Sequence, residues 1–191
     1  MKEDYPLKGF KTARSFETWL SKNHAKAPGI RVRFAKKSSG LKSITFAEAL
    51  DIALCYGWID GQGKGLDDQW YSNRFTPRRA RSTWSKVNRE NVARLIAEGR
   101  MQPAGQAEID RAKADGRWDA AYDPPSKATV PDDLAKALKA SPKAKRFFDT
   151  LDSRNRYAIL HRVQTAKKQE TRAKRIATFV EMLAKGEKLY S

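Results

Sequence analysis

The spacing of apolar residues changes once along this chain, and that change limits the folds open to it. Two early stretches, Ile30–Ala35 and Trp70–Thr76, have the extended pattern of β-strands, the first alternating apolar and basic residues. After the sequence Asp-Pro-Pro-Ser at 123–126, every apolar stretch has the spacing of an amphipathic helix. We therefore predict an α+β fold, with N-terminal helices around a small antiparallel sheet and a C-terminal helical region.

The N-terminal elements follow from short local signals. Residues 15–24 have the apolar spacing of a helix, and Thr45 with Glu48 forms a capping box that begins another. Glycines at 61, 63 and 65 are expected to form the turn of a β-hairpin. A phosphate-binding loop is the other interpretation, but such a loop precedes a helix, and here a strand follows.

The proline-rich segment also predicts the domain organisation. We expect an α+β domain over residues 1–122, a linker over 123–130, and a C-terminal helical region over 131–191. Within that region, Ser141 precedes Pro142 as an N-cap precedes a first helical proline, and Phe147 and Phe148 belong to an amphipathic stripe.

The charge of the chain is its strongest compositional signal. Lysine and arginine number 39 against 22 acidic residues, which gives a net charge of +17. Such a chain attracts nucleic acid, acidic proteins or anionic headgroups through screened long-range forces. Its single cysteine excludes an internal disulfide, and no apolar run is long enough for a membrane span. With a polar N-terminus as well, we expect a cytoplasmic protein without membrane insertion.

Few residues suggest catalysis or metal binding. His24 and His161 are the only histidines, and neither has a cysteine or carboxylate at ligand spacing, so we predict no metal site and no cofactor. Cys55 lies in an apolar helix without an adjacent histidine, where cysteine behaves as a small hydrophobic residue.

Two basic clusters are candidates for binding nucleic acid or another polyanion, because a guanidinium group makes bidentate contacts with phosphate. One begins within the second predicted strand and continues just after it, and the other lies in the C-terminal helical region. The eight residues are Arg74, Arg78, Arg79, Arg81, Lys167, Lys168, Arg172 and Arg175. A solvated helix face is the alternative for the C-terminal run, and the C-terminal helices are also candidates for binding a protein partner.

An aromatic and charged cluster on the predicted hairpin supports a rival function. It consists of Trp58, Asp60, Tyr71, Arg74 and Trp84. In a pocket, Asp60 would act as a general base or orient the arginines, while Arg74 and Arg78 would hold a small anionic substrate. The structural alternative is an Asp–Arg pair among core tryptophans. The sequence therefore leaves an enzyme open but favours a non-enzymatic binder.

Four ordered blocks carry a family resemblance. They are Phe46–Leu50 with Ala53–Gly61, Arg74–Arg79 with Ser82–Asn88, Gly99–Gly105 with Asp115–Trp118, and Ala166–Ile176. Together they resemble the bacterial YdeI/OmpD-associated (bacteriocin-protection) family over roughly residues 15–186. Tyr56 departs from the phenylalanine expected there.

The resemblance implies a role in tolerance to bacteriocins or antimicrobial peptides and an association with an outer-membrane porin, but no reaction or catalytic residues. We therefore expect a bacterial stress-tolerance protein of unknown biochemical activity that binds a polyanion. A charge of +17 repels cationic peptides, so protection by direct capture of such peptides is not expected.

Overall fold

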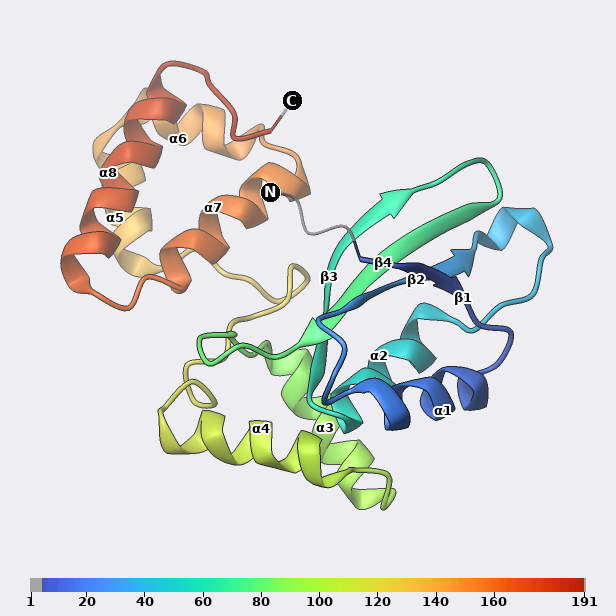
Figure 1. Ribbon diagram of the computed structural model, residues 1–191. Coiled ribbons are helices and arrows are strands. Elements are labelled where there is room, and N and C mark those ends of the chain that lie inside the picture. The colour runs from blue at the N-terminus through green and yellow to red at the C-terminus, as the bar shows by residue number, and fades with distance from the viewer. Residues whose placement is uncertain (1–4, 191) are drawn as a thin grey trace. The chain divides into compact units, whose positions relative to one another are not determined.

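A four-stranded mixed sheet organises the N-terminal part of the protein. The computed structural model describes residues 5–190 (Figure 1). β2 (Ile30–Ala35) and β3 (Trp58–Gly65) both pair antiparallel with β4 (Trp70–Pro77), and β1 (Leu7–Gly9) pairs parallel with β2. The strand order is β1-β2-β4-β3. The α+β class is confirmed, but the purely antiparallel sheet is corrected, because a three-residue strand is too short to show an alternating pattern.

The hairpin turn differs from its prediction. The three glycines lie inside β3, whose pairing with β4 is interrupted by a bulge. Residues 66–69 make the turn instead, and Asp67 Oδ1 accepts hydrogen bonds from the backbone N–H groups of Gln69 and Trp70, both at 2.8 Å. An aspartate that binds its own backbone therefore takes the role expected of glycine.

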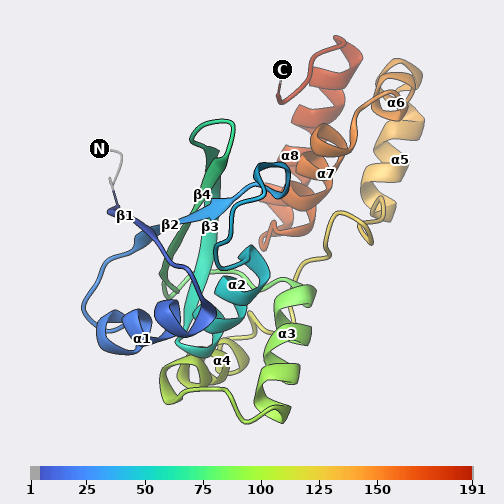
Figure 2. The same cartoon turned by 90° about the vertical axis from the view of Figure 1, so that its right-hand side faces the viewer.

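Two helices cover one face of the sheet, α1 (Ala13–Asn23) and α2 (Phe46–Cys55) (Figures 1 and 2). The predicted capping box of α2 is confirmed, because Thr45 Oγ1 accepts from the Glu48 N–H and Glu48 Oε2 accepts from the Thr45 N–H. A short 3-10 turn, η1 (Lys37–Ser39), follows β2. The core between helices and sheet contains Phe16, Leu20, Ile30, Val32, Phe34, Ala49, Ile52, Ala53, Trp58 and Phe75.

Two further helices, α3 (Lys86–Ala97) and α4 (Pro103–Ala114), follow the sheet. Gly105 of α4 packs so closely on the end of α2 that an added Cβ would lie 2.7 Å from the Leu54 carbonyl oxygen and closer still to that of Cys55. The approach of the two helices therefore requires a residue without a side chain at this position.

The C-terminal part is entirely helical, as predicted. Within residues 5–190, no helix is both long and apolar enough to cross a membrane. The hydrophobic core of this C-terminal part contains Leu134, Leu138, Ala144, Phe148, Ile159, Leu160, Val163, Ile176, Phe179 and Leu183. The helices are α5 (Asp132–Ala140), α6 (Pro142–Asp149), α7 (Ser153–Gln164) and α8 (Gln169–Ala184).

The chain divides into two compact units. The first runs to Trp84 and resumes over Asn88–Asp119, and the second contains Ser85–Val87 and everything from Ala120 onward. Asp123, at the start of the predicted linker, is held within the second unit. Its carboxylate lies 2.6 Å from Lys86 Nζ and accepts a hydrogen bond from Gln164 at 2.8 Å, and these two contacts lower its pKa.

Candidate nucleic-acid interface

The strand pairing sorts the sheet residues of the first unit onto two faces. Side chains alternate along a strand, so the residues between the buried Ile30, Val32 and Phe34 point away from α1 and α2. In the strand register, Arg31 of β2 pairs with Arg74 of β4. Ser72 of β4 pairs with Arg33 of β2 on one side and with Lys64 of β3 on the other. We call the four basic residues on this open face the sheet-face cluster: Arg31, Arg33, Lys64 and Arg74.

Like charges stand opposite one another in this cluster without a neutralising carboxylate. Arg31 and Arg74 are direct cross-strand partners, an arrangement that costs up to about 1 kcal/mol in a sheet. Asp60 is the only acidic residue in the four strands, and it pairs with the core residue Phe75, which assigns it to the helix-covered face. Among residues 5–190, no ion pair involves any member of the cluster.

Local packing fixes where these arginines lie. Gly61 leaves room for Arg74, since a Cβ there would stand 2.6 Å from Arg74 Nε. That Nε is buried and has no hydrogen-bond acceptor in the described part of the chain. Arg31 Nη1 donates to Ser72 Oγ at 3.4 Å. The Arg33 guanidinium lies over the Trp70 ring, with 4.3 Å between Cζ and the ring centroid. The open face therefore combines fixed cations with an aromatic surface.

The other arginines of the first predicted cluster lie beyond β4. Arg78 is buried, its guanidinium stacks 3.6 Å from the centroid of the Trp84 ring, and Nη1 donates to the Thr83 carbonyl. Arg79 and Arg81 are exposed in the loop that follows. The structure therefore separates Arg74, on the sheet, from Arg78, which holds a loop in place.

The residues of the candidate pocket are distributed over the first unit. Trp58 is a core residue whose indole N–H donates to the His24 carbonyl at 3.1 Å. The Tyr71 ring stacks on Phe34, with 5.3 Å between ring centroids. Trp84 is buried against Trp118 as well as Arg78. These aromatic rings support the hydrophobic core.

Asp60 and Arg74 belong to opposite faces of the sheet, so the carboxylate does not orient that guanidinium. Burial raises the pKa of Asp60, and the positive charge of Arg78 opposes this shift in part. The cation whose charge acts on this carboxylate is therefore Arg78 rather than Arg74.

In the second unit, the predicted arginines are engaged by the protein itself. The Arg172 guanidinium contacts both carboxylate oxygens of Asp133 and also donates to the Val163 carbonyl at 2.9 Å. Arg175 Nη1 donates to the Arg162 carbonyl. Lys167 and Lys168 are exposed in the segment before α8. The two arginines thus connect elements of the helical unit.

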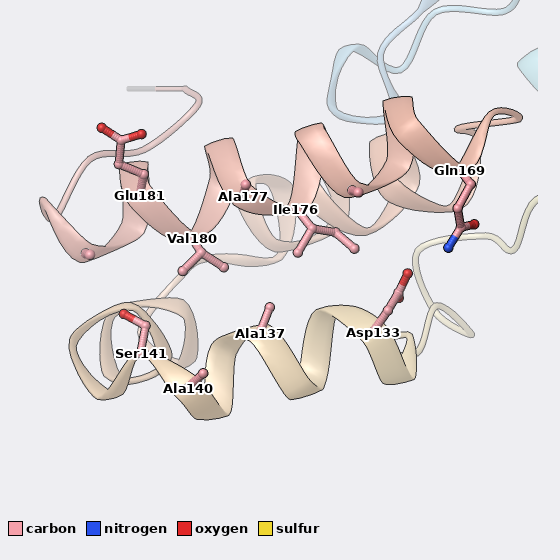
Figure 3. Close-up of a pocket in the computed structure, with 11 residues that line it drawn as sticks. Asp133, Ala137, Ala140, Ser141, Gln169, Ile176, Ala177, Val180 and Glu181 are labelled. Atoms are coloured by element: carbon pink, nitrogen blue, oxygen red, sulfur yellow. The ribbon is translucent and has the colours of Figure 1, made fainter.

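A groove of about 620 Å³ lies between α5 and α8 (Figure 3). In Figure 3, Ile176 and Val180 of α8 face Ala137 of α5, with Asp133 near one end and Glu181 near the other. No cation lines this groove. A polyanion is therefore not attracted into it, and binding of a protein partner by the C-terminal helices stays a prediction.

The described residues contain no group of three or more histidine, cysteine or acidic side chains that could hold a metal ion. Cys55 is buried at the end of α2, and burial raises the pKa of its thiol to about 11. The arrangement therefore does not activate this thiol as a nucleophile.

The sequence interpretation missed Arg31, Arg33, Lys64 and Trp70 as members of a possible interface. A signal was present, because the stretch Ile-Arg-Val-Arg-Phe places a basic residue at every second position of a predicted strand. Such spacing puts both arginines on one face. Lys64 gave no comparable signal, since its face depends on the bulge in β3.

The fold and the sheet-face cluster define a basic α+β protein with a mixed-sheet unit and a helical unit. Residues 8–108, more than half of the chain, match the family model described as a domain of unknown function (DUF8412), and residues 127–186 match that described as bacteriocin-protection, YdeI or OmpD-associated. The chain therefore belongs to the first family. The second match supports the predicted resemblance over residues 127–186, but of the four sequence blocks that carried it only Ala166–Ile176 lies there. No curated protein and no solved structure matches the chain.

Proposed function

We propose that this protein is a non-enzymatic, cytoplasmic nucleic-acid binder, and that the open face of its sheet is the binding surface. The observation that carries the proposal is the direct pairing of Arg31 with Arg74 on a face to which the four strands contribute no carboxylate. A protein stabilised only by its own contacts gains nothing from such a pair. Phosphate groups laid across the sheet would relieve the repulsion and release counterions.

The expected contacts are with the nucleic-acid backbone. Arginine and lysine bind phosphate without reading sequence, and Trp70 offers a ring on which an unpaired base can stack. Mixed-sequence single strands should therefore bind with little sequence preference.

Fluorescence anisotropy with a labelled mixed-sequence oligonucleotide tests this proposal. The double substitution Arg31→Gln with Lys64→Gln should weaken binding at low salt. The matched control, Lys22→Gln with Lys26→Gln, removes the same charge from exposed positions on and just after α1 and should bind nearly as the wild type does. Equal loss in both variants, or no binding by the wild type at low salt, contradicts the proposal.

A role in bacteriocin protection follows from the C-terminal family and is part of the proposal. With a net charge of +17, the protein repels cationic peptides, so protection would act indirectly through the bound polyanion. Cells that produce the wild type should survive bacteriocin treatment better than cells that produce the Arg31/Lys64 variant at equal abundance. Equal survival of cells that produce the wild type and cells that produce the variant would show that protection does not depend on this surface.

A further inference from the structure

A small pocket borders the sheet-face cluster at the edge formed by β1. We call it the edge pocket; its volume is about 220 Å³, room for about seven water molecules. Three of the residues that line it are basic: Lys11, Arg33 and Lys42. None of the lining residues is acidic.

Within the described part of the chain, the three cations have no counter-ion. No ion pair or side-chain hydrogen bond involves Lys11, Arg33 or Lys42 within residues 5–190. Elsewhere in the first unit, basic side chains do find carboxylates, as Arg94 does with Asp51 at 2.7 Å. The edge pocket therefore concentrates uncompensated positive charge, which an anion would neutralise.

Hydrogen bonds tie the two lysine-bearing segments to each other and to β2. The Ile44 N–H donates to the Phe10 carbonyl at 3.1 Å, which ties the segment after β1 to the segment before α2. The Ala35 N–H, at the end of β2, donates to Ser43 Oγ at 2.9 Å. The backbone on both sides of the pocket is thus fixed before any ligand arrives, which lowers the entropic cost of binding.

Arg33 is positioned from two sides. A Cβ on Gly9 would lie 3.2 Å from Arg33 Nη2, so glycine at this position lets the guanidinium lie across β1. The Trp70 ring supports the other side, 4.3 Å from Arg33 Cζ. A guanidinium packed on its faces keeps its N–H groups available at the edge, where a phosphate can accept two hydrogen bonds.

We propose that the edge pocket binds a phosphomonoester, the doubly charged phosphate group found at a nucleic-acid 5′ end and on small phosphorylated molecules. A monoester carries close to two negative charges at neutral pH, whereas each backbone phosphodiester carries one. Three cations around one pocket therefore favour the monoester. The inference rests on the proposed function because Arg33 belongs to both sites, and it names the group that the surface binds beside the backbone.

Two measurements on the full-length protein test the pocket separately from general nucleic-acid binding. The variant is Lys11→Gln with Lys42→Gln, and the control is again Lys22→Gln with Lys26→Gln. First, thermal unfolding in phosphate is compared with unfolding in chloride at equal ionic strength. Phosphate should raise the Tm of the wild type and the control by more than that of the pocket variant, because a ligand stabilises the state that binds it, whereas the general stabilising effect of phosphate acts on all three proteins.

Second, anisotropy compares one 3′-labelled oligonucleotide with and without a 5′-phosphate. The phosphorylated strand should bind the wild type about 10-fold more tightly, and this preference should disappear in the pocket variant. If phosphate raises the Tm as expected but both strands bind with equal affinity, the pocket is supported and its ligands are small phosphorylated molecules. Absence of both effects overturns the inference, even if both strands bind, in which case the proposed function survives alone.

Discussion

The salt dependence of binding gives a quantitative test of the sheet-face cluster. Each phosphate neutralised on a single strand contributes about −0.7 to the slope of log K against log salt. If each of the four cations of the sheet-face cluster neutralises one phosphate, the expected slope is about −2.8. Raising salt from about 50 to about 200 mM should then weaken wild-type binding about 50-fold.

Removing two cations should change the slope as well as the affinity. The Arg31→Gln, Lys64→Gln variant retains two members of the cluster, so we expect a slope of about −1.4 and only about 7-fold weakening over the same range. The Lys22→Gln, Lys26→Gln control should keep the wild-type slope. Anisotropy titrations at four or more salt concentrations measure all three slopes. A wild-type slope shared by the sheet variant would refute the assignment of phosphate contacts to this face.

Three further predictions concern stability and reactivity. Gly105→Ala should destabilise the first unit by about 3 kcal/mol in urea unfolding, because its Cβ would overlap backbone carbonyl oxygens, whereas Gly65→Ala, which meets open space, should change stability by less than about 0.5 kcal/mol. Since burial raises the pKa of Cys55 to about 11, a thiol reagent at pH 8 should modify the native protein far more slowly than the urea-unfolded chain. Burial raises the pKa of Asp60 in the folded state, so ionisation of this carboxyl lowers the stability of the fold as pH rises above the unfolded-state pKa of about 3.9. Asp60→Asn should therefore be more stable than the wild type at pH 7, and the difference should disappear in acid. A variant that is less stable than the wild type at pH 7 would mean that the attraction of Arg78 for the carboxylate outweighs the cost of burial.

Elements fixed by neighbouring residues could be predicted from the sequence. The start of α2 depends on Thr45 and Glu48, three residues apart, and α4 begins at Pro103, where a missing N–H costs nothing. The helices of the second unit likewise follow from apolar spacing within single turns. In each case, the signal and the structure that it predicts lie within a few residues.

The candidate interface could not be predicted in the same way because it depends on pairing between distant segments. Arg31 and Arg74 are 43 positions apart, and only the strand register makes them neighbours. The sequence interpretation grouped Arg74 with Arg78 because they are close along the chain, but the chain leaves the sheet between them, and Arg78 stacks on Trp84 instead. Arginines that are close along the chain were therefore not the ones that lie close together in the structure.

The net charge of +17 therefore says less about function than the partners of each cation do. In the second unit, Arg172 is held by Asp133, and Lys145 lies 2.5 Å from Asp149, so these cations stabilise helices. On the open sheet, Arg31 meets another arginine. A cation that is paired with a carboxylate must give up that contact to bind a ligand, whereas a cation without a partner only gains a contact with the ligand. Selection for solubility would scatter cations among carboxylates, and their concentration on one face of the sheet favours a ligand that carries the missing negative charge.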